Sequence, residues 1–395
     1  MRKLSRRRRS WLDHRSRRGH ARKRLARQRI RLNRFMKSTQ AVGTYGRLVT
    51  VYSNGKYQSA ILEGTPRRVP EVLSFHPEYY DQTADFIANV RAGLSRAVPF
   101  RRHRRARHGS SLIRIGSYWD FATLQQISIP AALVLASEYD RVRQLRGAVP
   151  RAVNLQTWNP RVRSLLFDIG FLDLSGVEPS GVETVPSREG KLLRMRRGAD
   201  ANGERIAEYL QMLGIDLTIE DPGLSDAIME GITNSVQHAY RHPELCPADT
   251  VREWWIAAAL EGRRRLRMAI YDQGASIPAT LPMWDKYPGW LRAFKRLVGV
   301  DLNQEPDPND RRYDGDAIKL AIEVGRTSTE LGGRGKGLHQ VVSVLDLSKN
   351  GSITIYSRCG RLRCVKGEAP EAVNLRTGII GTLVVWDLEL GDIDG

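Results

Sequence analysis

The stretch that decides the fold of this chain is EGITNSVQHAY, residues 230–240. Glu230, Asn234 and His238 recur at four-residue intervals, so a helix over Leu224–Tyr240 places them on one surface, about 5–6 Å apart. The apolar positions fall on another side and anchor the helix to a sheet: Leu224, Ile228, Ile232, Val236 and Ala239. The polar face is either a solvated stripe or the wall of a site, and later segments decide between these alternatives.

The first such segment is DQGASI, residues 272–277, directly after an expected strand over Arg265–Tyr271. An acidic residue at the end of a strand, followed by glycine, is typical of a turn that leaves a carboxylate pointing into a cleft. Asp272 and Gly274 are therefore candidate site residues.

The second segment is the glycine-rich run GGRGKGL, residues 332–338, in front of an expected helix over Leu338–Leu345. Glycines 333, 335 and 337 let backbone N–H groups approach an anion, and the positive end of the helix dipole adds to the attraction. The run is either a phosphate cradle or a flexible loop. The order of the three segments, about forty residues from the first to the second and about sixty to the third, favours the cradle.

The three segments resemble the N, G1 and G2 boxes of the GHKL ATPase superfamily, and Gly381-Thr382 resembles its last, adenine-side Gly-Thr pair. The resemblance covers roughly Glu204–Leu388, and the Asn-to-His-Ala-Tyr ending is most similar to the anti-sigma-factor serine kinases that work with STAS partners. It implies an α+β two-layer sandwich, the Bergerat ATP-binding fold, over residues 195–390. ATP and Mg²⁺ are the implied cofactors.

By the same resemblance, Asn234 supplies a side-chain oxygen to a Mg²⁺ ion that bridges the ATP phosphates, since this hard cation prefers oxygen ligands. Glu230, one helical turn earlier, acts as general base or positions the attacking water or hydroxyl. Asp272 accepts a hydrogen bond from the adenine 6-amino group and repels the guanine carbonyl.

The other implied nucleotide-binding residues are Gly274, Gly333, Arg334, Gly335, Lys336, Gly337, Leu338 and Thr382. Gly274 permits the turn, and the glycines of the run bind phosphate through their amides. Arg334 and Lys336 either add charge-assisted contacts or face solvent. Thr382 contacts adenine directly or through water. His238 is interpreted as structural rather than catalytic, because nothing in the sequence supplies it with a partner.

Residues 110–180 form an upstream unit, a small α/β domain in which strands and helices alternate. Its expected elements are Leu112–Ile115, Pro130–Arg146, Ala152–Gln156 and Asn159–Ile169. Residues 159–174, NPRVRSLLFDIGFLDL, resemble the end of a STAS domain, which implies docking of a protein partner. The phosphoacceptor turn of that family reads QISIP here, so Ser128 is interpreted as an ordinary residue at a helix N-terminus.

The formal net charge of +20 is concentrated in two basic segments. Residues 1–37 contain seventeen Lys or Arg and one acid, and residues 101–107 contain five arginines. The arm over residues 1–40 either contacts nucleic acid through counterion release, with little sequence choice, or is a solvated tail or assembly arm. Residues 41–109 are less defined, with one expected helix over Pro77–Leu94 and the second basic run as a linker.

No apolar run approaches the roughly 18–20 residues needed to cross a bilayer. The three cysteines, Cys246, Cys359 and Cys364, form no zinc or disulfide framework, which fits a reducing compartment. We therefore expect a cytoplasmic protein without membrane contact.

The C-terminal half contains two further features. Residues 278–331 are either an ATP lid or a fixed helical insertion. Three short strands are expected near the end of the chain, over Ser352–Tyr356, Arg363–Val365 and Thr382–Leu388.

The leading functional hypothesis is an ATP-binding regulatory protein with Mg²⁺-dependent ATPase or serine/threonine kinase activity and nucleotide-gated partner binding. The alternative is a non-catalytic, nucleic-acid-associated module that uses ATP as a conformational switch. A sensor histidine kinase is disfavoured, because none of the eight histidines lies in a dimerisation helix in front of an acidic residue.

Overall fold

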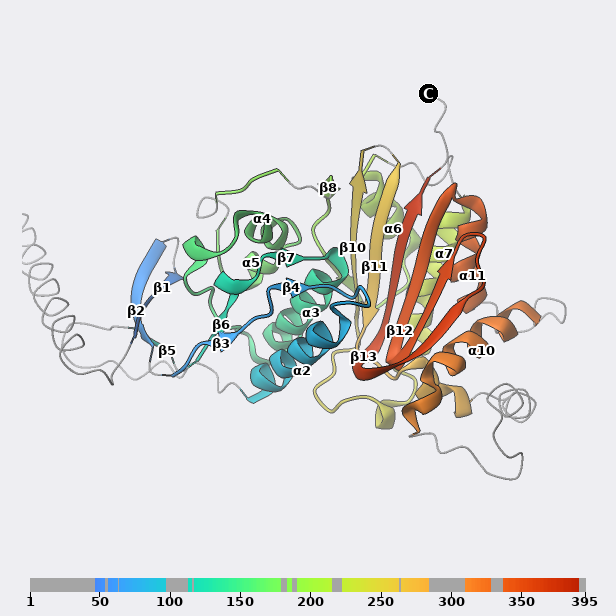
Figure 1. The fold of residues 1–395 in the computed structure, drawn as a ribbon, viewed down its shortest axis with the longest axis horizontal. Coiled ribbons are helices and arrows are strands. Elements are labelled where there is room, and N and C mark those ends of the chain that lie inside the picture. Colours follow the sequence, from blue (N-terminus) through green and yellow to red (C-terminus); the bar gives the residue numbers. More distant parts are fainter. Residues whose placement is uncertain are drawn as a thin grey trace, which may run out of the picture.

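The computed structural model describes residues 47–53, 56–62, 64–96, 113–115, 117–178, 183–186, 190–214, 222–262, 264–283, 310–327 and 337–390. These residues form a mixed α/β fold in which a six-stranded antiparallel sheet lies between two groups of helices (Figure 1). None of the helices among them is long and apolar enough to span a membrane. The basic segments 1–37 and 101–107 lie outside the described residues, so the predictions about them stay predictions.

The centre of the sheet is the hairpin of β10 (Trp254–Glu261) and β11 (Arg265–Asp272), whose residues pair in antiparallel register. The strand order is β12-β13-β11-β10-β8, and β9 also pairs with β10. The other strands of this sheet are β8 (Lys191–Leu192), β9 (Arg196–Gly198), β12 (Asn350–Val365) and β13 (Glu371–Glu389).

Both faces of the sheet are covered, and β10 shows the consequence in its sequence. Every residue from Trp254 to Leu260 is buried. One core takes Trp255, Ala257 and Ala259, and the other takes Trp254, Ile256, Ala258 and Leu260. Since successive side chains point to opposite faces, a strand covered on both sides has no polar–apolar alternation. The sequence interpretation missed β10 for this reason.

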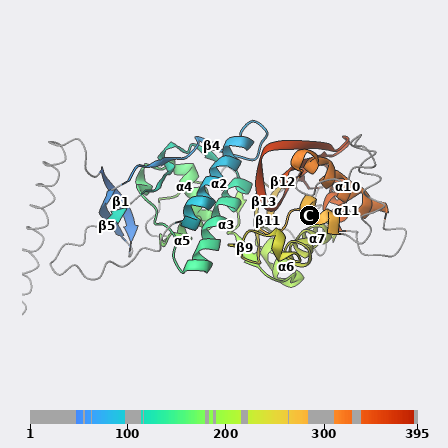
Figure 2. The same ribbon diagram turned by 90° about the horizontal axis from the view of Figure 1, so that it is seen from below.

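Four helices cover one face of the sheet (Figure 2). They are α6 (Gly203–Gln211), α7 (Pro222–Gln237), α10 (Asp314–Thr327) and α11 (Gly337–Leu347). The core beneath them is fixed in part by Trp386, which is completely buried and donates its indole N–H to the Val341 carbonyl oxygen over 3.3 Å. The prediction of helices packed on an antiparallel sheet is therefore confirmed.

Two upstream helices, α2 (Tyr80–Arg96) and α3 (Ile129–Arg146), cover the opposite face and add a third layer. Ser128 caps α3 by accepting a hydrogen bond from the Ala131 N–H over 3.4 Å, as interpreted from the sequence. Most of α3, from Ile129 to Val142, is buried, because it lies between the sheet and the smaller upstream elements. A hydrogen bond also joins β12 to the chain before α2: the Tyr356 hydroxyl donates to the Phe75 carbonyl oxygen over 2.6 Å.

The smaller upstream elements pack on the outer side of α2 and α3. β1 (Arg47–Ser53), β2 (Lys56–Leu62) and β5 (Ile113–Ile115) form a three-stranded sheet. Two short parallel pairs follow, β3 (Arg67–Arg68) with β6 (Trp119–Asp120) and β4 (Val72–Leu73) with β7 (Gln126–Ile127). The helices α4 (Pro160–Asp168) and α5 (Phe171–Leu174) complete the unit.

One strand prediction is wrong, and another has the right positions but the wrong lengths. Residues 152–156 form a single bridge from Val153 to Val51, after which the backbone turns at Asn154, whose φ of 51° is left-handed and breaks the strand. The three short strands expected near the C terminus are instead the two long strands of the β12–β13 hairpin, with a register shift near Arg358. Polar and basic residues within these strands concealed their length.

Candidate functional site

Asp272 is the last residue of β11, and only 4% of it is exposed. The Gly274 backbone N–H donates to Oδ1 over 3.0 Å, and the Ser235 hydroxyl donates to Oδ2 over 3.2 Å. Burial raises the pKa of Asp272 to about 7, although these donors act in the opposite direction. The site therefore contains a buried acid that changes charge near neutral pH.

The turn after Asp272 requires the glycine at residue 274. A Cβ at this position would lie 2.2 Å from the Ala239 carbonyl oxygen, where no side chain fits. The next residue, Ala275, donates its N–H to that same oxygen over 2.6 Å. The turn thus docks on the chain just beyond α7, in the way predicted for Gly274.

Thr382 lies on β13, opposite Asp272 in the strand register. Its hydroxyl shares a hydrogen bond of 2.9 Å with the Ser357 hydroxyl on β12. The preceding Gly381 has a φ of 69°, and a Cβ there would lie 2.0 Å from the Asp272 carbonyl oxygen. Glycine followed by threonine therefore lets β13 approach β11 closely beside the acid.

These groups meet at one cavity of about 60 Å³. Four predicted site residues line it, namely Asn234, Asp272, Leu338 and Thr382, and His238 lines it as well. Much of the remaining wall is apolar and includes Ile270, Ile277, Val341 and Val384. The wall is thus mostly apolar, with an acid, an amide and a hydroxyl placed along it, a composition that small-molecule sites share.

Asn234 has an unsatisfied group at this cavity. Its Nδ2 atom is buried and has no hydrogen-bond partner within the described part of the chain. A buried polar group without a partner is costly, so the amide is placed for a ligand. Among the described residues, no group of three or more His, Cys, Asp or Glu side chains is arranged to hold a metal ion. A cation here would be held by the Asn234 oxygen together with oxygens of the ligand and of water.

Glu230 and His238 flank Asn234 but differ in position. Glu230 lies one turn earlier on α7, does not line the cavity, and has a pKa raised by partial burial. His238 lines the cavity just beyond the last residue of α7, and desolvation together with Arg241 lowers the pKa of its imidazole. Its ring makes no hydrogen bond to the described residues, so nothing in that part of the chain orients it for proton transfer.

Part of the predicted phosphate cradle cannot be placed. Gly333, Arg334, Gly335 and Lys336 lie outside the described residues, as do residues 284–309 of the predicted lid, and their roles stay predictions. Gly337 is the first residue of α11, and the cavity is lined by the residue after it, Leu338. The helix that the glycine-rich run precedes therefore begins at the cavity.

Ser235 belongs to the site and was missed by the sequence interpretation. It is buried, and its hydroxyl lies 3.2 Å from both the Gly231 carbonyl oxygen and Asp272 Oδ2. A signal was present, because Ser235 follows Ile232 by three residues on the apolar side of the helix. A polar residue at such a position requires a buried partner.

The far side of the turn after Asp272 contacts α3. Gln273 is completely buried, and its Nε2 donates to Glu138 Oε1 over 3.0 Å. Glu138 also pairs with Arg91 at 2.8 Å and with Arg141 at 2.9 Å. Asp249 pairs with both arginines, at 2.8 and 2.7 Å. The site is thereby joined to a buried network of charges between the sheet and the upstream helices.

Comparison of the chain with protein-family models, with curated proteins and with solved structures gives no match. The functional interpretation therefore depends on the geometry of the cavity and the chemistry of its residues.

Proposed function

We propose that the chain binds ATP together with Mg²⁺ in the cavity at Asp272, and that it is a regulatory protein of the GHKL type with ATPase or serine/threonine kinase activity. The observation that carries the proposal is the convergence of Asn234, Asp272, Leu338 and Thr382, from four separate segments, on one cavity. The antiparallel sheet with α7 and α11 on one face supports the same class of fold.

The adenine ring is proposed to occupy the apolar part of the cavity. Val341 and Val384 are among its wall residues and offer apolar surface to the ring. The Asp272 carboxylate accepts a hydrogen bond from the 6-amino group, and Thr382 binds the ring directly or through water. Guanine presents a carbonyl oxygen in place of the amino group, so the buried carboxylate rejects it.

The phosphates extend from the base toward the start of α11 and the Asn234 amide. Asn234 is the residue that would hold Mg²⁺, which when bound with ATP neutralises phosphate charge and fixes the phosphate geometry. Glu230 is proposed to accept the proton of the attacking water or hydroxyl, and its raised pKa favours proton acceptance. The glycine-rich run before α11 is proposed to surround the phosphates.

Nucleotide titration of single-residue variants tests this proposal. We expect Asn234→Ala and Asp272→Ala to lose ATP binding in isothermal titration calorimetry with Mg²⁺, whereas Glu230→Ala binds ATP and lacks turnover. Gln237→Ala is the matched control, since Gln237 lies on α7, is exposed and does not line the cavity. Binding by Asn234→Ala and Asp272→Ala equal to that of the wild type would exclude this site.

Turnover separates the leading function from its alternative. Radiolabelled phosphate transfer in cell lysate distinguishes a kinase, which labels a protein, from an ATPase, which releases labelled phosphate. ATP binding with neither product, unchanged in Glu230→Ala, would favour the non-catalytic switch. Under the leading proposal, the upstream unit of residues 110–180 docks the protein partner whose binding ATP controls.

A further inference from the structure

A second cavity, of about 280 Å³, lies in the part of the chain upstream of the central sheet. Its wall comes from β3, α2, α3 and α5, from residues 117–119, 121, 150–153 and 158, and from Ser175. Six aromatic side chains line it: Tyr118, Trp119, Phe121, Tyr139, Trp158 and Phe171. None of them lines the cavity at Asp272, so the two cavities are separate.

The aromatic rings are held in fixed mutual positions. Phe121 and Trp158 have ring centres 4.7 Å apart with planes 32° apart, and Tyr139 meets Phe171 edge to face at 4.7 Å. Trp119, which is partly exposed, packs its edge against Phe86 on α2. The other five rings are at most 7% exposed, so Trp119 is the ring that offers surface to a flat ligand, and the buried rings fix the wall beside it.

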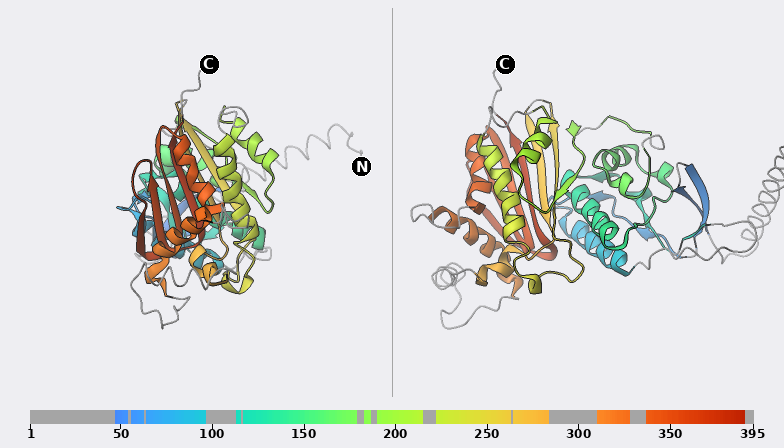
Figure 3. Two further views of the ribbon diagram at one scale, coloured as in Figure 1. Left: turned by 90° about the vertical axis from the view of Figure 1, so that its right-hand side faces the viewer. Right: turned by 180° about the vertical axis from the view of Figure 1, so that it is seen from behind.

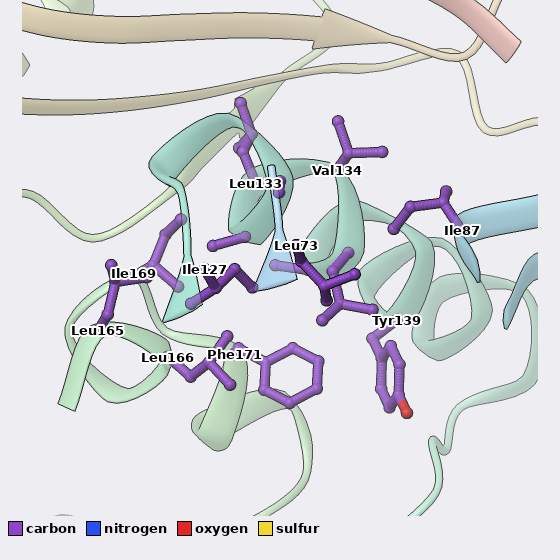
Figure 4. Close-up of a cluster of buried hydrophobic side chains, with 14 of the residues drawn as sticks. Leu73, Ile87, Ile127, Leu133, Val134, Tyr139, Leu165, Leu166, Ile169 and Phe171 are labelled. Atoms are coloured by element: carbon purple, nitrogen blue, oxygen red, sulfur yellow. The ribbon is translucent and has the colours of Figure 1, made fainter. Parts of the chain in front are cut away.

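Tyr139 brings an unpaired polar group to this cavity. Only 4% of the residue is exposed, and within the described residues its hydroxyl makes no hydrogen bond. Figure 4 shows Tyr139 at the edge of the buried apolar cluster with its hydroxyl directed away from that cluster. Tyr139 lines the cavity, so this hydroxyl offers a hydrogen bond to whatever occupies it.

The charge of the wall favours an anionic ligand. Arg67 and Arg151 line the cavity, and its described lining contains no aspartate or glutamate. The Arg67 guanidinium lies 4.9 Å from the centre of the Trp119 ring. Gly93 on α2 leaves room for this pair, because a Cβ there would lie 2.8 Å from Arg67 Nη1 and 3.2 Å from the Trp119 ring. The Arg67–Trp119 pair thus lies directly against α2 at Gly93.

We propose that this cavity binds a nucleotide, with the base stacked on Trp119 and hydrogen-bonded to Tyr139 and the phosphate at the arginines. Aromatic rings accept any base, and arginine pairs well with phosphate oxygens. A free nucleotide and a nucleotide unit of a single-stranded nucleic acid share this chemistry. Two arginines in one wall suit the successive phosphates of the polyanion. The inference is independent of ATP binding at Asp272.

The test uses the full chain with uridine monophosphate and with an eight-residue uridine oligomer, because a pyrimidine does not satisfy an adenine site. Binding is measured at 0.5 M salt, on the order of the concentration at which counterion-driven contacts are suppressed. We expect the oligomer to bind more tightly than the monophosphate; equal affinity would assign the cavity to free nucleotides. Failure of both ligands to bind would overturn the proposal.

Variants assign the binding to the cavity. Ser117→Glu places a negative charge on an exposed wall residue, and Trp119→Ala removes a stacking surface. Each should weaken binding about 10- to 100-fold. Tyr139→Phe should weaken it about fivefold. Gln156→Glu is the charge control, since Gln156 is exposed and not part of the wall, and Tyr80→Phe removes a buried unpaired hydroxyl that does not line the cavity.

A second readout maps the contact directly. An oligomer that contains 5-iodouridine forms covalent bonds with adjacent aromatic residues under ultraviolet light, and mass spectrometry identifies them. We expect labelled peptides that contain Tyr118, Trp119 or Trp158. Labelling confined to residues 1–37, or affinity unchanged in Ser117→Glu and Trp119→Ala, would show that the nucleotide binds elsewhere.

Discussion

Asp272 places an ionisable group where water does not reach it, and burial moves its pKa from 3.8 to about 7. Between these two values the folded chain binds more protons than the unfolded chain does. Its contribution to the free energy of unfolding therefore decreases as pH rises from about 4 to about 7. A carboxylate that must be charged to accept the adenine amino group is thus a source of instability at the pH at which it binds best.

The direction of this pH dependence leads to a prediction for Asp272→Asn. The amide avoids the burial of a charge and keeps an oxygen for the Gly274 N–H. We expect the variant to be more stable than the wild type at pH 8, by about 1 to 3 kcal/mol, and to lose most of this advantage at pH 5. Urea unfolding at the two pH values measures the difference. The Asp272→Asn variant is expected to lose ATP binding at both pH values.

The control is Asp387→Asn on β13. The Asp387 side chain is one-third exposed, and it forms an ion pair with Arg265. Its effect on stability should be small and should change little between pH 5 and pH 8. An Asp272→Asn variant that is less stable than the wild type at pH 8 would show that the buried carboxylate is not a burden on the fold.

Single residues of the site could be predicted where they belong to a local pattern. Asn234 follows a helical spacing, and Asp272 ends a strand in front of a glycine. Gln273 could not be predicted, because its partner Glu138 is 135 residues away. The residues around Gln273 in the sequence predict only a turn. The contact between this turn and α3 arises only when α3 packs on the sheet.

Secondary-structure elements, like single residues, could be predicted from local sequence, but their distant contacts could not. The spacing and the Ser-Ile-Pro start of α3 predicted the helix almost to the residue. They did not predict that charged residues of this helix are buried, since Glu138 and Arg141 each have only 1% of the side chain exposed. The sequence of α3 resembles a surface helix, because the network that neutralises those charges is contributed by α2 and by residue 249.

This network predicts a strong effect of Glu138→Ala. The change leaves Arg91 and Arg141 without their buried acidic partner and removes the acceptor of the Gln273 amide. We expect a loss of about 3 to 5 kcal/mol in the free energy of unfolding. We also expect weaker ATP binding, because the turn that carries Asp272 loses its support from α3. Urea unfolding and calorimetry measure the two effects.

The control variant is Asp387→Ala, which breaks an exposed ion pair with Arg265. It should change the free energy of unfolding by about 0 to 1 kcal/mol. Glu138→Gln should lie between the two, since its amide oxygen still accepts from Gln273. Equal stability of Glu138→Ala and Asp387→Ala would mean that the buried network contributes nothing beyond a surface pair.

In the whole molecule, the central sheet belongs to two cores at once (Figure 3). The apolar residues Trp255, Tyr271 and Leu383 pack toward α2 and α3, and the opposite side packs against α7 and α11. The sequence predicted the second of these cores, because its helices and strands are neighbours along the chain. It did not predict the first, since residues 190–390 contain no element that covers that face within the described part.

The shared sheet predicts that the two parts of the chain unfold together. A fragment of residues 190–395 would expose the face formed by Trp255, Tyr271 and Leu383, and we expect it to aggregate or to bind the dye ANS. The full chain should unfold in urea with coincident transitions by fluorescence and circular dichroism. Coexpression of residues 1–189 with the fragment should restore its solubility by covering the same face. A fragment that is monomeric and has the urea midpoint of the full chain would instead make α2 and α3 an appendage, and the buried network would then have no part in holding the site together.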